Sequence, residues 1–164
     1  SSGAEKVWLN SAAFDRPGLV TEIAARFGSQ SIVVSIDVKK NFFGKYEVYT
    51  HCGTQKKPGT PEEWATAFEE AGAGELLLNV IDKDGTREGF DLKILQKMHG
   101  TVNIPVIASC GAGSAEHLRA ALVEGKAHAV AAGSFFVFHG RRQAVLISYP
   151  DEAELNSITA GTSK

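Results

Sequence analysis

A unit that recurs five times constrains the fold of this 164-residue chain more than any other feature. Each unit begins with a glycine and continues into a short, uninterrupted apolar run rich in Val, Ile, Leu or Ala. A run of this kind is typical of a strand buried on both faces, as in a parallel sheet. The glycines are Gly3, Gly28, Gly72, Gly100 and Gly125, and the runs after them are KVWLN, IVVSID, ELLLNVID, IPVIAS and HAVAAGS.

Helical patterns lie between the apolar runs. Residues 17–27 begin with a proline and carry apolar side chains at helical spacing. A second helix is predicted from Thr60, an N-cap residue that is followed by a proline and two acidic residues. Asp91 and Ser114 are N-cap candidates for two further helices. The order of strand, loop, helix and glycine therefore predicts βαβ units around a parallel sheet.

One of the units is longer than the others. Successive glycines are 25, 44, 28 and 25 residues apart, and the long interval contains an insertion at residues 39–59. Within it the segment YEVYT, residues 46–50, alternates between polar and larger side chains. We expect this segment to form a small hairpin over one end of the sheet.

Two architectures fit the repeat: an open doubly wound sheet and a (β/α)8 TIM barrel. Gly3 resembles the stop after a helix that lies outside these residues, and an eight-unit barrel needs about 250 residues. We therefore expect an α/β fold in which residues 1–164 are the C-terminal portion of a single (β/α)8 barrel domain. This incomplete barrel of about five βα units would have open sheet edges, which favour self-association.

The composition excludes several classes of protein. The net charge is −2 and no run of Lys or Arg exceeds two residues, so we expect no nucleic-acid partner. The apolar stretch at residues 129–138 is too short to span a bilayer, and no secretory leader is present, so we expect no membrane partner. Two cysteines form neither a disulfide framework nor a zinc pattern. A cytoplasmic location fits best.

Polar residues directly follow each predicted strand. In parallel α/β folds the carboxyl ends of the strands carry the chemistry. Loops are polar in any case, but five strand ends acting together favour a shared site. The residues at these ends are Asn10 and Ser11; Asp37 and Lys39; Asn79, Asp82 and Asp84; Ser109; and Gly133 and Ser134.

Asp37 is the most informative of these residues, because it ends an otherwise apolar strand. A carboxylate there loses hydration unless it is paired or has a function. A positioned Asp can act as a general acid or base. The structural alternative is an ion pair with Lys39 or Lys40.

Two successive strands lead into glycine-rich loops, SCGAGS at residues 109–114 and AAGSFF at residues 131–136. Small residues let backbone N–H groups approach an anion, and barrels often bind phosphate in their last two loops. The sequence therefore predicts a phosphate site, with tight packing at strand ends as the alternative.

The segment NVIDKDGT, residues 79–86, raises the question of a metal site. A calcium loop needs a Glu at its twelfth position, which is Lys93 when the count begins at Asp82. We therefore expect no metal here, and an Asp-Gly turn is the alternative. Lys6 and Glu75 lie at the amino ends of their strands, where a surface ion pair is the simplest expectation.

Six segments together, in order, resemble the cyclase subunits of imidazole glycerol phosphate synthase. These are (β/α)8 barrels of histidine biosynthesis, and the resemblance runs from their fourth strand to their eighth. It covers residues 3 to about 138. The matching segments are GAEKVWLNSAAF, FGSQSIVVSIDVKK, YEVYTHCG, GAGELLLNVIDKDGTREGFDL, IPVIASCGAGS and AVAAGSFFVF.

The resemblance implies a function. Such cyclases use two aspartates and ammonia from a glutaminase subunit to close the imidazole ring of a phosphorylated substrate, without a cofactor. It implies that Asp37 is the fifth-strand aspartate, while the first-strand aspartate is absent, so we expect the isolated chain to be inactive. By the same resemblance Lys6 and Glu75 belong to the gate for ammonia. The implied substrate and phosphate residues are Asn10, Ser11, Asn79, Asp84, Gly85, Ser109, Gly111, Gly113, Gly133 and Ser134.

Three positions depart from the cyclase pattern. Asn79 stands where the cyclases usually carry Thr, and Cys52 and Cys110 each replace a usual glycine. Residues 34–50 and 131–150 look closer to a related branch that delivers ammonia to a sugar-amidating complex for surface polysaccharide. Two alternatives to a cyclase therefore stay open: an ammonia-delivering barrel, and a non-catalytic half-barrel module that only assembles.

Overall fold

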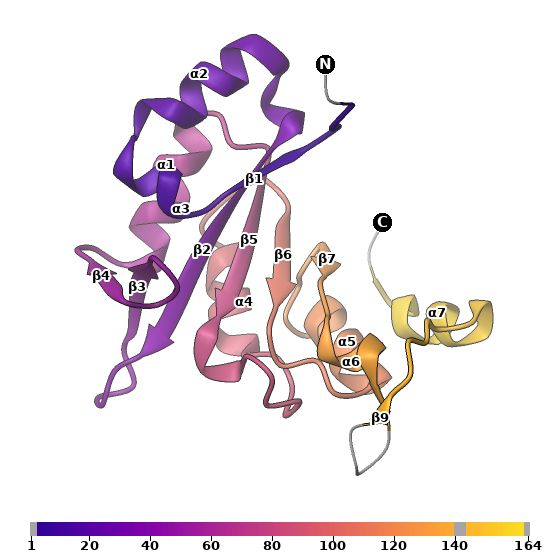
Figure 1. Ribbon diagram of the computed structural model, residues 1–164. Helices are drawn as coiled ribbons and strands as arrows, with labels where there is room; N and C mark the ends of the chain where they lie inside the picture. The colour runs from indigo at the N-terminus through magenta and orange to yellow at the C-terminus, as the bar shows by residue number, and fades with distance from the viewer. Residues whose placement is uncertain (1–2, 140–143, 163–164) are drawn as a thin grey trace.

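A mostly parallel sheet lies at the centre of the chain (Figure 1). The computed structural model describes residues 3–139 and 144–162, so the expectation of one domain over residues 1–164 extends beyond them. Within the described part, the sheet order is β4-β3-β2-β5-β6-β7. Strand β1 pairs with the first part of β2, and β3 pairs with the last part of β2. The strands are β1 (Val7–Leu9), β2 (Ile32–Lys40), β3 (Tyr46–Thr50), β4 (Gln55–Lys57), β5 (Glu75–Val80), β6 (Val106–Ser109) and β7 (Ala129–Val130).

Each predicted apolar run forms a strand, and these strands, β1, β2, β5, β6 and β7, run parallel. Helices follow them as the sequence predicts. The helices are α1 (Ser11–Asp15), α2 (Gly18–Phe27), α3 (Pro61–Glu70), α4 (Leu92–His99), α5 (Ala115–Val123), α6 (Ser134–Val137) and α7 (Glu152–Thr159), with the 3-10 turns η1 (Ser29–Ser31) and η2 (Ile81–Lys83) and a small ribbon of β8 (Phe138–His139) and β9 (Ala144–Val145).

The predicted N-caps differ in how they work. Thr60 forms a capping box, because its hydroxyl accepts from the Glu63 N–H at 3.2 Å while the Glu63 carboxylate accepts from the Thr60 N–H at 2.7 Å. The Ser114 hydroxyl accepts from the His117 N–H at 3.3 Å. Asp91 stands at the N-cap of α4, but its carboxylate binds side chains of the β2–β3 hairpin, as described below.

The helices cover one face of the parallel sheet. Val34 and Ile36 of β2 and Leu76 and Leu78 of β5 alternate along their strands and share one buried core with residues of the helices. A doubly wound sheet would bury both faces under helices. The fold is therefore that of a partial (β/α) barrel, and the face away from the helices, here called the inner face, corresponds to the barrel interior.

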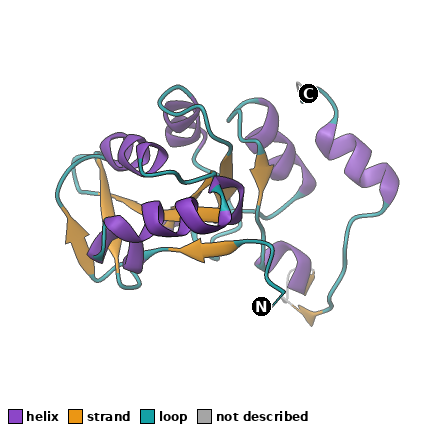
Figure 2. Cartoon of the chain, turned by 90° about the horizontal axis from the view of Figure 1, so that it is seen from above, coloured by secondary structure: helices purple, strands orange, loops and turns teal. Residues whose placement is uncertain are grey.

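The inserted segment extends the sheet and does not cover its end. Strand β3 pairs antiparallel with the last part of β2, with Asp37 opposite Tyr49 and Lys40 opposite Tyr46. Strand β4 pairs with β3. Figures 1 and 2 place this hairpin at one end of the molecule and α7 at the other. None of the helices in the described ranges is long and apolar enough to cross a membrane.

Candidate functional site

Asp37 lies at the carboxyl end of β2 on the inner face, and only 7% of its surface is exposed. Its Oδ1 accepts hydrogen bonds from the Asn10 Nδ2 at 2.8 Å and the Asn79 Nδ2 at 2.9 Å. The Ser35 hydroxyl lies 3.4 Å from the same oxygen and also accepts from the Asn79 amide at 2.9 Å. Three strands, β1, β2 and β5, therefore fix one oxygen of this carboxylate.

The second oxygen of Asp37 has a different environment. No described residue donates a hydrogen bond to Oδ2. Among the described residues, every buried side-chain nitrogen or oxygen has a partner, so Oδ2 keeps contact with solvent. One oxygen is thus held and the other is accessible, which is the arrangement that a general acid or base requires.

The predicted ion-pair alternative for Asp37 does not form with Lys40. Side chains alternate along a strand, so Lys40 points to the opposite face from Asp37. Its ammonium instead lies 2.5 Å from Asp91 Oδ2, and the Tyr46 hydroxyl donates to Asp91 Oδ1 at 2.8 Å. Lys39 shares the face of Asp37 but makes no ion pair within the described residues. Amides and hydroxyls, not lysines, therefore surround Asp37.

The Lys40–Asp91–Tyr46 cluster has shifted acid–base properties. Burial raises the pKa of Asp91, but the hydrogen bonds from Lys40 and Tyr46 outweigh it, so the net pKa lies below its usual value. The hydrogen bond to Asp91 raises the pKa of Lys40. Burial, followed by Asp91, raises the pKa of Tyr46. The cluster is therefore a stable ion pair that ties the hairpin to the start of α4.

Asn10 and Ser11 connect the Asp37 environment to the hairpin. The Ser11 hydroxyl donates to Asn10 Oδ1 at 3.2 Å and accepts from the His51 backbone N–H at 2.8 Å. The His51 ring lies 3.3 Å from Asp15, which also pairs with Lys57 at 2.9 Å. The β3–β4 turn is thus held against the carboxyl end of β1, and Ser11 orients the amide that binds Asp37.

The strand register joins Asp37 to the glycine-rich loops. Asp37 lies opposite Asn79 of β5, and Asn79 lies opposite Ser109 of β6. Beyond Ser109 a pocket of about 360 Å³ opens at the strand ends. We call it the strand-end pocket, and its lining residues are Trp8, Asp84, Gly85, Ser109, Cys110, Gly111, Ala112, Ala131, Ala132, Gly133 and Ser134.

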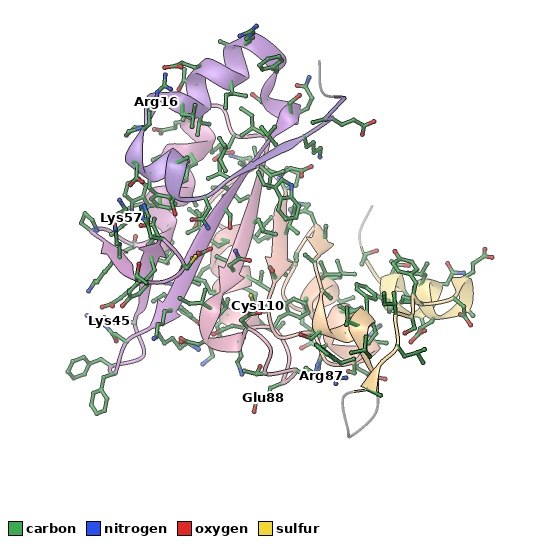
Figure 3. All side chains as sticks on the ribbon, viewed as in Figure 1. Arg16, Lys45, Lys57, Arg87, Glu88 and Cys110 are labelled. Carbon is green, nitrogen blue, oxygen red and sulfur yellow. The ribbon has the colours of Figure 1, made fainter. Side chains whose placement is uncertain are left out.

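Six of the ten residues predicted for the substrate and its phosphates line this pocket, and the four that do not are Asn10, Ser11, Asn79 and Gly113. A Cβ on Gly113 would lie 2.1 Å from the Arg87 carbonyl, and one on Gly111 would lie 2.4 Å from the Gly89 carbonyl. Both glycines allow close packing against the loop at residues 87–89, which is the alternative that the sequence left open. Figure 3 shows Cys110, Arg87 and Glu88 together at this end of the sheet.

Gly133 has a different reason to be a glycine. Its φ is −111°, which any residue adopts, and an added Cβ would meet no atom within 4 Å. Neither the backbone nor the described packing therefore requires a glycine here. The open space in front of it belongs to the strand-end pocket, where a ligand can approach the backbone closely.

Cys110 is a half-buried thiol in the wall of the same pocket. Burial raises the pKa of this thiol to about 11; the hydrogen bond with Ser109 opposes the rise, and the nearby Asp84 and Asp37 carboxylates add to it. The thiol is therefore protonated at neutral pH and is not a nucleophile.

Lys6 and Glu75 lie on the inner face at the amino ends of β1 and β5, and they form an ion pair. This is the pairing expected at that position. A larger cavity, about 560 Å³, lies near the amino end of β7 and is lined by His99, Lys126 and His128 among others. It contains none of the residues predicted for the site.

Trp8 is the pocket residue that the sequence did not indicate. The run KVWLN predicts a strand buried on both faces, and Trp8 is not among the residues predicted for the site. Trp8 instead lies on the inner face and is 61% exposed. Its neighbour Leu9 packs against the helix-side core, because successive side chains of a strand point to opposite faces of the sheet.

Comparisons with known proteins agree with this geometry. The chain is 49% identical over 156 residues to a provisionally named imidazole glycerol phosphate synthase subunit, hisF2, of Pseudomonas aeruginosa, which covers 95% of the chain and 62% of that protein. It is 52% identical over 138 residues to the imidazole glycerol phosphate synthase subunit HisF of Chlorobaculum tepidum, covering 83% of the chain and 54% of that protein.

The chain is also 45% identical to the imidazole glycerol phosphate synthase subunit HisF of Alkaliphilus metalliredigens, covering 84% of the chain and 55% of that protein. The chain therefore spans between half and two thirds of the length of these relatives. The profile of the histidine biosynthesis protein family matches residues 1–142. With its parallel strands, one-sided helices and strand-end polar cluster, the chain belongs to the histidine biosynthesis protein family.

Proposed function

We propose that the whole protein is a cyclase that closes an imidazole ring with ammonia. Its products would be imidazole glycerol phosphate and an aminoimidazole carboxamide ribonucleotide, as the names of its relatives suggest. The observation that carries the proposal is Asp37, whose Oδ1 is held by two amides while Oδ2 stays accessible at the strand ends.

In this proposal Asp37 transfers protons during ring closure. The amides of Asn10 and Asn79 hold the carboxylate in one orientation, so Oδ2 faces the reacting atoms. A second aspartate, expected on the first strand of the whole barrel, supplies the opposite acid or base. A positioned acid or base of this kind contributes about 10²–10⁴-fold to rate.

The substrate would be held at its two ends. One phosphate would lie against the strand-end pocket, near Ser109, Gly133 and Ser134, where exposed backbone and hydroxyl donors face open space. The other would lie near Asn10 and Ser11 at the end of β1. Asp37, Asn79 and Ser109 lie in one register row, and Asn10 binds Asp37, which supports a single ligand that spans both ends.

Ammonia would come from a glutaminase subunit in the cytoplasm. The Lys6–Glu75 ion pair lies at the amino ends of the strands, on the inner face and away from Asp37. We infer that the glutaminase binds at that end and that ammonia passes this ion pair toward Asp37. The role of the ion pair as a gate is part of the proposal.

Complementation tests the reaction. The gene for the whole protein should restore growth without histidine to a bacterial strain that lacks the cyclase. The Asp37→Asn variant, expressed at the same level, should not restore it. A soluble whole protein that fails to restore growth would rule out the cyclase and leave the second function below.

The second function is ammonia delivery to another enzyme, such as one that amidates a sugar. The extent of the matches separates two groups of relatives: the hisF2 relative and the hisF3 relative of Vibrio vulnificus match 95% and 93% of the chain, whereas the HisF subunits match 83–87%. A larger share of the chain is thus common to the numbered subunits than to the HisF subunits. Ammonia transfer without cyclase activity would be its signature.

A further inference from the structure

Ser35 is a buried hydroxyl to which the proposed mechanism gives no role. It interrupts the apolar run of β2, and only 5% of its surface is exposed. A hydroxyl at this depth is unfavourable unless its hydrogen-bonding capacity is met. Side chains two residues apart on a strand share a face, so Ser35 lies on the inner face with Asp37, about 7 Å nearer the amino end of β2. The serine therefore lies behind Asp37 as seen from the strand ends.

Three side chains surround the Ser35 hydroxyl. Its oxygen accepts from the Asn79 Nδ2 at 2.9 Å and from the Asn10 Nδ2 at the longer distance of 3.4 Å. Its proton is donated to Asp37 Oδ1, also at 3.4 Å. A serine hydroxyl has two acceptor lone pairs and one proton, so its full capacity is used. The partners come from β5, from the end of β1 and from β2 itself.

Other hydroxyls in the described ranges show what a purely local role looks like. The Ser31 hydroxyl donates to the Phe27 carbonyl at 3.1 Å, and the Thr159 hydroxyl donates to a carbonyl within α7 at 3.0 Å. Such bonds meet the needs of the hydroxyl itself and involve no site residue. Among the described residues Ser35 bonds only side chains, and all of them belong to the environment of Asp37.

The two amides share the same pair of acceptors. Each amide nitrogen carries two protons and lies within hydrogen-bond distance of both Ser35 Oγ and Asp37 Oδ1. If either amide rotated by half a turn, its carbonyl oxygen would face the carboxylate, and two acceptors would meet. The hydroxyl therefore helps to decide which end of the Asn10 and Asn79 amides faces Asp37.

The cluster does not depend on how the whole protein closes over the inner face. All four side chains belong to described residues and bind one another, so further strands would enclose the cluster without supplying its contacts. Enclosure excludes water, and hydrogen bonds strengthen in a medium of lower dielectric constant. The orientation of the two amides is therefore a property of β1, β2 and β5 alone.

We propose that Ser35 is a positioning residue for ring closure: its hydroxyl holds the Asn10 and Asn79 amides with their N–H groups toward Asp37 Oδ1, and so directs Oδ2 at the reacting atoms. The inference rests on the proposed acid–base role of Asp37, and it adds which residue keeps the amides in place. Ser35 lies behind Asp37 and does not touch the substrate. Its loss should therefore lower kcat and leave KM nearly unchanged.

Three variants test this role in the kinetics of the whole protein with ammonium salt. Ser35→Thr keeps the hydroxyl, whereas Ser35→Val has nearly the same shape without it, so this pair separates hydrogen bonding from volume. Ser35→Val and Ser35→Ala should lower kcat by about tenfold, because a misplaced catalytic group can cost up to about 100-fold. Ser35→Thr should stay within about threefold of the wild type, and KM should change by less than about twofold in all three.

Ile36→Val is the control for lost packing in the same strand. It removes one methylene from the buried core on the helix side, so it should lower the thermal midpoint of unfolding and leave kcat unchanged. Thermal unfolding of the Ser35 variants shows whether each is folded at the assay temperature. A fall in kcat at a stability equal to that of Ile36→Val is then due to positioning.

The side-chain amide signals of Asn10 and Asn79 test the positioning without turnover. In the whole protein labelled with ¹⁵N, hydrogen bonds at both amide protons should protect these groups from exchange with solvent. In Ser35→Ala and Ser35→Val the exchange of both amides should become at least about tenfold faster, because each amide loses one acceptor. Ser35→Thr and Ile36→Val should keep the protection of the wild type.

Three results would overturn the inference: a kcat of Ser35→Ala and Ser35→Val close to that of the wild type, amide exchange that is the same with and without the hydroxyl, or equal losses of kcat in Ser35→Thr and Ser35→Val. If complementation fails while amide exchange depends on Ser35, the proposed reaction is wrong, although Ser35 still holds the amides toward Asp37. If complementation succeeds while exchange is independent of Ser35, the positioning role is wrong and the reaction stands.

Discussion

Cys52 and Cys110 illustrate at the residue scale what the sequence could and could not reveal. Both have left-handed backbones, with φ of 56° and 71°. A residue with a Cβ loses about 1–2 kcal/mol in this region, and glycine does not. The resemblance placed a glycine at both positions, and the backbone supplies the physical reason. The thiol environment of Cys110, in contrast, depends on loops far apart in the chain.

Replacing Cys52 tests the backbone strain. Cys52 is exposed, so its removal costs little packing. Cys52→Gly should raise the free energy of unfolding by about 0.5–1 kcal/mol, because relief of the left-handed strain outweighs the greater entropy of an unfolded glycine. Denaturant unfolding measures this. Cys52→Ala keeps the strain and is the control; equal stability of the two variants would show that the turn is unstrained.

Thiol labelling tests the environment of Cys110. With a folded-state pKa of about 11, the Cys110 thiol should react negligibly with iodoacetamide at pH 8 and increasingly as the pH approaches 11. Cys52 is exposed and should react at pH 8, which mass spectrometry of the labelled peptides would show. The Cys52→Ser variant isolates the signal from Cys110, and rapid labelling of that variant at pH 8 would contradict the raised pKa of the Cys110 thiol.

At the element scale, the helix starts that are encoded by neighbouring residues could be predicted, whereas contacts between residues far apart in the sequence could not. The capping box at Thr60 and the Ser114 cap are encoded within four residues, so the starts of α3 and α5 could be predicted. Lys40 could not be assigned, because its partner Asp91 is 51 residues away and β2 runs past its predicted end at Asp37. The face of the sheet on which Lys40 lies can be predicted only when β2 is known to continue as far as Lys40.

The Asp91 cluster makes a pH-dependent prediction for the hairpin. Asp91→Asn should lower the free energy of unfolding at pH 7 by about 2 kcal/mol, below the range for fully buried pairs because Lys40 is partly exposed. The folded-state pKa of Asp91 is depressed, so its stabilisation is present above the ordinary carboxyl pKa and is lost as the pH falls through the folded value.

Urea unfolding from pH 7 to pH 2 measures this dependence. The difference between wild type and Asp91→Asn should shrink toward zero at the acid end. Lys56→Met, which breaks the exposed Lys56–Glu47 pair between β3 and β4, is the control and should leave stability nearly unchanged. A difference between wild type and Asp91→Asn that is constant with pH would show that the ion pair is not its source.

At the scale of the whole molecule, repeat length predicted the parallel strands, and polar residues at strand ends predicted the row from Asp37 to Ser109. The prediction of a partial barrel, made over a doubly wound sheet, is confirmed by helices that cover one face of the sheet. In contrast, the sequence did not predict that Trp8 lines the strand-end pocket or that Gly113 packs against the Arg87 carbonyl. Which face or which loop a side chain meets is set by curvature of the sheet, which a single sequence does not encode locally.

The sheet edges lead to a prediction about assembly. In the described residues β1 pairs only with β2, and β7 pairs only with β6. Such edges favour pairing with another chain, so the 164-residue chain should self-associate. Analytical ultracentrifugation should give about twice the 17.5 kDa chain mass at micromolar concentration. Val7→Lys, which places a charge on the β1 edge, should weaken the association; a monomer at all concentrations would contradict it.

The rate of ring closure by the whole protein, with ammonium salt as the nitrogen source, tests the central claim most directly. Wild type should convert the phosphoribosyl substrate, and Asp37→Asn should be slower by at least about 100-fold in kcat. Binding of the glutaminase subunit should stay unchanged, because Asp37 lies away from the Lys6–Glu75 end. Activity of Asp37→Asn within a few-fold of wild type would contradict the assignment of Asp37 as the acid or base.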